Sequence, residues 1–239
     1  MNELLIAVGI IFLVGMIIGY VRGFIKIVAS LAVTIATIIL VMFLSPYVSN
    51  FILQYTPLEK AVQDRCIEMF TQEAEEVSEE MKEEVLSVDL TREEQISFVE
   101  NAKVPAMIEK QLLDNNNSEI YEALGVKTFG EYICKYLAKL IADILAFVIT
   151  FIVITIVARI VLKLLGVIGK LPIVGGVNKV AGGVLGLAGS LILVWILFAV
   201  VTLVYQTPFG IACFDNIAKS EFLTFLYDNN MLMKYIGGL

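Results

Sequence analysis

One uncharged stretch near the C-terminal end constrains the fold more than any other feature of this sequence. Within Gly175–Tyr205, no charged side chain occurs from Val180 to Val204. A helix crosses the bilayer hydrocarbon with about 20 apolar residues. The sequence therefore predicts a membrane-spanning helix at about 180–204.

The first half of this helix carries small residues at a regular spacing of four. These residues are Gly182, Gly186 and Ser190, with Gly183 and Gly189 beside them. The same spacing recurs near the N-terminus, at Gly15, Gly19 and Gly23. Small residues at this spacing form a shallow groove that a second helix backbone can approach closely. We therefore predict that the two grooves pack face to face. The alternative is that glycine is simply common in membrane helices.

Three further apolar runs extend the membrane prediction. We expect helices at about 4–21, 24–44 and 140–158, with Pro46 ending the second. The chain is 59% hydrophobic, above the roughly 45–50% of soluble domains. The predicted fold class is an all-α integral membrane protein with four transmembrane helices. They form two hairpins, in residues 1–46 and 137–205.

Residues 47–136 differ sharply in composition, because acidic side chains clearly outnumber basic ones. Pro57 suits the first position of a helix, which the run Glu73–Glu84 then continues. Thr91-x-x-Glu94 and Thr128-x-x-Glu131 match the capping box. Ser118 is expected to cap a short turn that ends at Gly125. We therefore expect a helical, extracytoplasmic insert between the second and third spans.

The C-terminal tail, residues 206–239, is too interrupted to cross a membrane. Its apolar residues favour a helix that lies at the membrane interface. They are Phe222, Leu223, Phe225, Leu226 and Tyr227.

Charges in the short connections predict the orientation. Arg22 and Lys26 join the first two spans, and no acidic residue accompanies them. The connection between the last two spans is also basic; its cations are Arg159, Lys163, Lys170 and Lys179. Positively charged short loops remain in the cytoplasm, so we expect both termini outside the cytoplasm.

The residue types present exclude several kinds of chemistry. The sequence contains no histidine, which removes Ser-His-Asp catalysis, histidine-ligated metals and the usual proton switch near neutral pH. We expect no enzymatic activity, no cofactor and no metal site. Cys66, Cys134 and Cys213 stand apart in sequence. We interpret them as small apolar filler, with a Cys66–Cys134 disulfide as the alternative.

A few polar residues in or near the spans are functional candidates. Asp143 is an acid within the third span, where ionisable groups are often functional, but a pair with Lys139 one turn away is our preferred interpretation. Asn178 is expected to cap its own helix or bind loop backbone. Arg22 is expected to snorkel, and Trp195 to serve helix packing. The hydroxyl residues of the second and third spans could line a polar path, although such groups more often bond to their own helix. These are Ser30, Thr34, Thr37, Thr150 and Thr155.

Two blocks of sequence resemble the colicin V production protein family. The first is Gly15-x-x-x-Gly19-x-x-Arg22-Gly23-Phe24, and the second runs from Leu171-Pro-x-x-Gly175 through Asn178 to Gly189. The helix between them, Phe147–Lys163 with Arg159, is similar to the third span of the family. The resemblance implies a four-span inner-membrane protein associated with toxin production or export, and more broadly with envelope homeostasis. Compact family members lack an insert as long as residues 47–136.

We therefore expect a non-enzymatic scaffold or accessory factor of the bacterial envelope. Its expected partners are membrane lipids and either another membrane protein or further copies of the chain, with no nucleic acid. An oligomeric channel or transporter is the alternative function. A third hypothesis, a membrane anchor for an enzyme, follows from the use of similar four-span units in some extracytoplasmic serine proteases.

Overall fold

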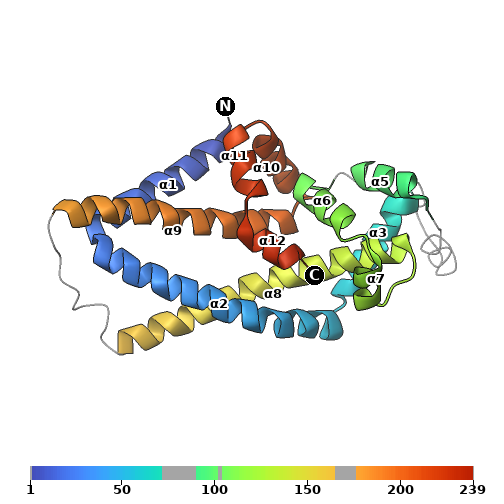
Figure 1. Ribbon diagram of the computed structural model, residues 1–239, viewed down its shortest axis with the longest axis horizontal. Helices are drawn as coiled ribbons and strands as arrows, with labels where there is room; N and C mark the ends of the chain where they lie inside the picture. Colours follow the sequence, from blue (N-terminus) through green and yellow to red (C-terminus); the bar gives the residue numbers. More distant parts are fainter. Residues whose placement is uncertain (1, 72–89, 102–103, 165–175, 239) are drawn as a thin grey trace. The chain divides into compact units, whose positions relative to one another are not determined.

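The computed structural model describes residues 2–71, 90–101, 104–164 and 176–238. Every regular element in these residues is an α-helix (Figure 1). Four helices are long and apolar enough to cross a membrane: α1 (Glu3–Arg22), α2 (Phe24–Tyr55), α8 (Phe129–Leu164) and α9 (Gly176–Leu203). The all-helical class with four candidate spans is thereby confirmed. The predicted helix over Glu73–Glu84 lies outside the described residues.

The helices divide between two compact units. The first, Met1–Pro46 with Ala146–Leu232, includes α1, α9, α10 (Pro208–Ala218) and α11 (Glu221–Asp228). The second, Tyr47–Leu145 with Met233–Leu239, includes α3 (Leu58–Thr71), α5 (Arg92–Asn101), α6 (Ala106–Asp114), α7 (Ser118–Leu124) and most of α12 (Met231–Gly237). Helices α2 and α8 each contribute residues to both units.

Both of these shared helices are longer than a membrane span requires. They contain 32 and 36 residues, which at about 1.5 Å per residue exceeds the roughly 30 Å of bilayer hydrocarbon. The prediction that Pro46 ends the second helix is wrong, because α2 continues through it to Tyr55. Proline removes one backbone hydrogen bond, a loss that membrane helices tolerate. No further proline or glycine follows before Tyr55, so the helix continues beyond Pro46.

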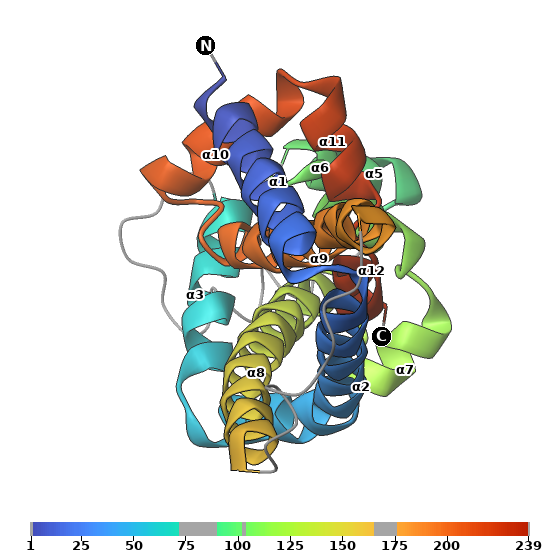
Figure 2. The same cartoon turned by 90° about the vertical axis from the view of Figure 1, so that its left-hand side faces the viewer.

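In the first unit, α1 packs antiparallel against α9 (Figures 1 and 2). The outer face of α1 is apolar and exposed, as at Ile10 and Ile17, which are 54% and 50% exposed. Such a surface suits contact with lipid, where helices satisfy their own backbone groups.

The tail of the first unit folds back on α9 and α1 as two helices, α10 and α11. The helix predicted from Phe222 to Tyr227 is α11, and Thr207 and Ser220 cap α10 and α11. Residues Phe12 and Phe222 join α1 to α11, with ring centroids 6.3 Å apart. Asn2 on the N-terminal side of α1 donates a hydrogen bond to the Asn216 carbonyl of α10. The tail therefore lies at the N-terminal end of α1.

Trp195 joins this tail to α9 by hydrogen bonds. Its indole Nε1 donates to the carbonyl of Leu226 at 3.1 Å, and Asn230 donates to the Trp195 carbonyl at 2.9 Å. Nearby, the Tyr227 hydroxyl lies 3.2 Å from Thr202 Oγ1. Burial raises the pKa of Tyr227, so the phenol stays protonated.

The second unit surrounds the first part of α8 with short helices. Aromatic rings on α8 form its centre: Tyr132 stacks on Tyr121 of α7, and Phe129 meets Phe98 of α5 edge to face. The Tyr132 hydroxyl donates to the Leu112 carbonyl of α6 at 2.8 Å. Helix packing in this unit therefore resembles the core of a soluble domain, with its large side chains inside.

Local signals fix several helix starts in this unit. The capping box at Thr91 and Glu94 is confirmed, since Thr91 N donates to Glu94 Oε2 at 2.8 Å and Glu94 N to Thr91 Oγ1 at 3.4 Å. Asn117, not Ser118, caps α7 by accepting from the Ile120 N–H. Asparagine and serine both cap helices well, so the sequence alone does not decide which of these two neighbours is the cap. Gly125 ends this helix, as predicted, and the structure places it in the left-handed conformation.

Candidate functional site

The contact between α1 and α9 is made of backbone rather than side chains. We call it the small-residue seam, formed by Gly15, Gly19, Gly23, Gly182, Gly186 and Ser190. A Cβ atom at Gly19 would lie 3.0 Å from the Gly186 Cα, and nearer still to the Gly182 carbonyl oxygen. A Cβ at Gly186 would lie 2.9 Å from the carbonyl carbon of Gly15. Because both obstacles are backbone atoms, the helices could accept a larger residue only by moving apart.

The seam has a simple antiparallel register. Gly15 lies opposite Gly186 and Ser190, while Gly19 lies opposite Gly182 and Gly186. Gly183 and Gly189 lie at its edges, where an added Cβ would make ordinary contacts of 3.5–3.6 Å with Met16 and Leu31. The structure therefore brings the two predicted triplets together at four-residue steps.

Ser190 adds a polar link to the seam. Its hydroxyl lies 3.2 Å from the Ile11 carbonyl of α1 and 3.0 Å from the Gly186 carbonyl of its own helix. One hydroxyl proton can serve either acceptor. Interhelical hydrogen bonds of this kind contribute about 0.6 kcal/mol on average in membranes, so close backbone contact remains the main attraction.

At the other end of the seam, Asn178 of α9 caps the N-terminus of α2, a helix far from it in sequence. Its Oδ1 accepts a hydrogen bond from the Ile25 N–H at 3.3 Å. That N–H belongs to the first turn of α2, where donors lack intrahelical partners. The prediction that Asn178 caps its own helix or binds loop backbone is therefore wrong, because α9 already begins at Gly176.

Gly23 makes this arrangement possible. Its φ of 80° lies in the left-handed region that glycine adopts readily. The residue ends α1 through its N–H, which donates to the Gly19 carbonyl, and α2 begins immediately after it. A side chain at Gly23 would collide with the Asn178 amide. The turn and its cap therefore fit only when position 23 is glycine.

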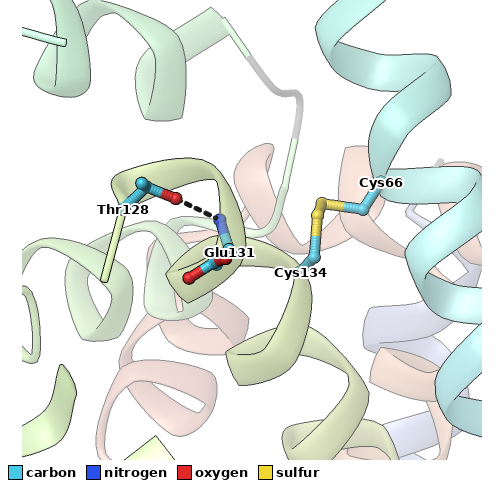
Figure 3. Close-up of a disulfide and its surroundings, with 4 residues drawn as sticks. All are labelled: Cys66, Thr128, Glu131 and Cys134. Carbon is cyan, nitrogen blue, oxygen red and sulfur yellow. Dashed lines mark hydrogen bonds between the residues drawn. A yellow bond between two sulfur atoms is a disulfide. The ribbon is translucent and has the colours of Figure 1, made fainter. Parts of the chain in front are cut away.

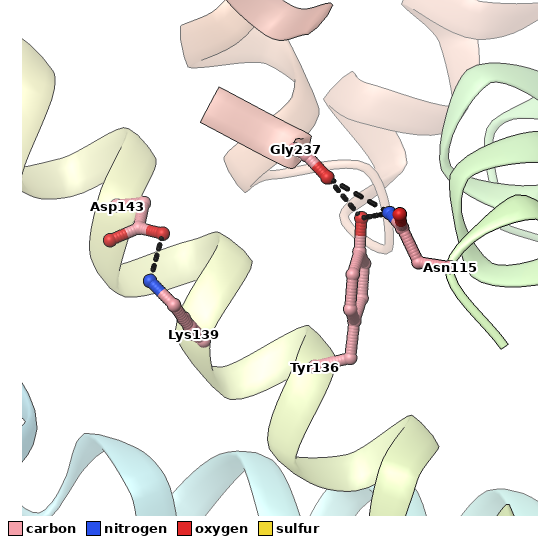
Figure 4. A network of polar contacts seen from close by, with 5 residues as sticks. All are labelled: Asn115, Tyr136, Lys139, Asp143 and Gly237. Atoms are coloured by element: carbon pink, nitrogen blue, oxygen red, sulfur yellow. Dashed lines mark hydrogen bonds and ion pairs between the residues drawn. The ribbon is translucent and has the colours of Figure 1, made fainter. Parts of the chain in front are cut away.

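The remaining polar candidates take part in local contacts or lie on the surface. Lys139 and Asp143 form an ion pair at 2.8 Å (Figure 4). Arg22 and Arg159 are exposed, each near the C-terminal end of its helix. Thr34 Oγ1 donates back to the Ser30 carbonyl. None of these contacts gathers the candidates into one site in the described part of the chain.

Polar side chains in the second unit hold the last helix of the chain. Asn115 and Tyr136 both donate to the Gly237 carbonyl, at 3.1 and 2.6 Å (Figure 4). Gln111 donates to the Met233 carbonyl at 3.1 Å. The bonds to Gly237 satisfy a carbonyl in the last turn of α12, which the helix cannot pair internally. The sequence offered no signal for them, because the partners lie more than a hundred residues apart.

The cysteines differ from the favoured prediction. Cys66 of α3 and Cys134 of α8 form a disulfide (Figure 3), so their interpretation as apolar filler is wrong and the alternative holds. Cys213 is a free, buried thiol, consistent with filler. Within the described ranges, no three potential ligands are grouped to hold a metal ion.

We predict that the seam tolerates no large side chain. Gly19→Leu or Gly186→Leu should abolish the close approach of α1 and α9, because overpacking against backbone costs about 1–3 kcal/mol or more. Thermal unfolding of the detergent-solubilised protein measures the loss. Gly9→Leu is the matched control on the same helix, since a Cβ there meets no atom within 4 Å. Equal losses for Gly9→Leu and Gly19→Leu would contradict the seam.

A cysteine pair tests the register directly. We expect Met16→Cys with Gly183→Cys to form a disulfide on mild oxidation, because a Cβ at Gly183 lies 3.6 Å from Met16 Cγ. Moving the first cysteine to Gly9 should abolish the cross-link.

Asn178 generates a second prediction. Asn178→Ala should lower stability by about 1 kcal/mol, the usual contribution of an N-terminal cap, which corresponds to a melting temperature about 2–4 °C lower. Asn178→Asp keeps the acceptor oxygen and should retain most of the stability. A matching loss in both variants would show that the Ile25 hydrogen bond contributes nothing.

Comparison with known proteins identifies part of the chain. The family model described as colicin V production protein matches residues 122–230. This range includes the seam residues of α9 and all of α8, whereas the first block of resemblance, Gly15–Phe24, lies before it. No curated protein and no solved structure matches the chain. Residues 122–230 are therefore similar to the colicin V production protein family, and four helices of the described structure are long and apolar enough to cross a membrane.

Proposed function

We propose that this protein is a non-enzymatic scaffold or accessory factor in the envelope, acting in envelope homeostasis or in production or export of a colicin V-like toxin. The proposal rests on one observation: polar side chains near the spans are engaged in hydrogen bonds or an ion pair within the protein. Ser190 and Thr202 bond to backbone carbonyls, and Asp143 pairs with Lys139. Groups engaged in this way stabilise helix packing and are not free to react with a substrate.

The second unit gives such a scaffold a surface for partners. It is held by a disulfide, by aromatic contacts and by the bonds that retain α12. Several of its charged side chains are exposed, including Glu119, Glu122 and Lys127. We propose that it binds another membrane protein or a second copy of the chain, while the first unit contacts lipid.

We further propose a bacterial inner-membrane location, with both termini and the insert outside the cytoplasm. The basic short connections support this orientation. The composition of the second unit also supports it, because Met233–Leu239 of the tail belongs to the same unit as the insert. Two segments on the same side of a membrane are separated by an even number of crossings. The spans in α8 and α9 are two such crossings between the insert and the tail.

Cysteine labelling in intact cells should establish the orientation. On a cysteine-free background, Glu119→Cys should react with a membrane-impermeant maleimide, and Gly176→Cys should react only after the membrane is opened. Both positions are exposed, and a Cβ at Gly176 meets nothing within 4 Å. The reverse pattern would overturn the orientation.

The functional proposal is tested by complementation and cross-linking in the host. Deleting the gene should increase sensitivity to membrane-active detergents, and Gly9→Leu should restore resistance while Gly19→Leu should not. A photo-cross-linker at Glu119 should capture an envelope protein or a second copy, and one at the lipid-facing Ile152 should not. An intact envelope after deletion, with no capture at Glu119, would exclude the scaffold.

One observation favours the alternative, an oligomeric channel or transporter. The buried Thr150 hydroxyl of α8 is without a hydrogen-bond partner in the described structure, as a group facing a polar path would be. Ion flux through proteoliposomes of the purified protein, abolished by Thr150→Val, would replace the scaffold proposal with this one.

A further inference from the structure

The disulfide joins the first helix of the insert to the helix that leads into the third span. Cys66 lies on α3 and Cys134 on α8, with their Cα atoms 5.5 Å apart (Figure 3). This separation is within the usual range for a disulfide. Both residues are 1% exposed. The pair is therefore part of the core of the second unit rather than a surface contact.

The disulfide attaches α3 to that core covalently. From Leu58 to Cys66, Cys66 alone is buried among residues whose side chains are described, and the others are exposed or half-buried. The segment 58–66 therefore buries little apolar surface and gains little from the hydrophobic effect. The covalent bond between α3 and α8 holds this segment in place where burial contributes little.

Such a bond also reports the compartment in which the unit folds. Cytosolic thiols are kept reduced, whereas disulfides persist outside the cytosol. We propose that Cys66 and Cys134 are oxidised on the extracytoplasmic side by a disulfide-bearing oxidant, and that the resulting bond clamps α3 to α8. The inference rests on the proposed orientation but uses a different observation from the charge of the loops.

The oxidation is a pair of thiol–disulfide exchanges. One cysteine thiolate attacks the donor disulfide, forming a mixed disulfide and releasing the first donor thiol. The second cysteine thiolate then attacks the protein sulfur of the mixed disulfide and releases the second donor thiol. Two electrons pass from the cysteine pair to the donor, and the two cysteine protons end on its thiols. Because both sulfurs are shielded in the folded unit, the exchange precedes the docking of α3.

Counting thiols in cells tests the oxidation. After acid quenching and denaturation, a polyethylene-glycol maleimide should modify one thiol per chain, Cys213, and all three after reduction. In Cys213→Ser the counts should be none and two. The proportion of oxidised chain should fall in a host that lacks extracytoplasmic thiol oxidases. Three reactive thiols in the unreduced wild type would overturn the inference.

A mutant cycle tests the clamp. Cys66→Ala should lower the melting temperature by about 5–15 °C, from the usual effect of a disulfide, and should expose α3 to protease. Cys134→Ala and the double variant should give the same shift, because each removes one shared bond. Additive losses would overturn the clamp, since they would indicate two independent packing effects.

The orientation and the disulfide can fail separately. If Glu119→Cys labels from outside while Cys66 and Cys134 are reduced in cells, the inference fails and the orientation stands. If Glu119→Cys is protected in intact cells, the proposed orientation itself fails.

Discussion

The arrangement of the first unit depends on backbone-to-backbone contact between α1 and α9. Inside a bilayer, apolar side chains gain nothing by leaving lipid for another helix, so association relies on close contact and hydrogen bonds. At Gly19 and Gly186 the backbones approach so closely that a Cβ would meet main-chain atoms. Dispersion contacts fall steeply with separation, so this proximity is the source of the attraction. The cap that Asn178 gives to α2 depends on the register of α1 and α9. The tail helices α10 and α11 also contact α9.

The second unit is stabilised by the contacts expected in water. Its centre is aromatic, as at Tyr132, and its large side chains point inward. Its helices are short, and short helices are marginal without tertiary contacts. The disulfide, the capping box at Thr91 and the bonds from Asn115 and Tyr136 to Gly237 therefore provide stability that seven- to fourteen-residue helices lack alone. The first unit is thus joined mainly by glycine backbone contact, and the second by covalent, aromatic and polar links.

The sequence predicts features that depend on local spacing and fails where a partner lies far away in the chain. The four spans, the glycine triplets and the Thr91 capping box are periodic or local signals. Local sequence places the Asn178 bond within its own helix or loop, because its actual partner, Ile25, is 153 residues away. The Cys66–Cys134 pair is separated by 68 residues, and spacing alone could not distinguish it from apolar filler. Pro46 shows a third limit, because its local preference was overridden by the helical residues around it.

Glycine composition would not by itself have located the seam. Gly9 and Gly19 share a helix and an apolar neighbourhood, yet a Cβ at Gly9 meets nothing while one at Gly19 meets the α9 backbone. Glycine within a helix is less favourable than alanine by about 1 kcal/mol, so a run of glycines weakens the isolated helix. In α9 that local disadvantage is offset only when α1 occupies the groove. The two helices therefore specify each other's position through the close approach of their backbones.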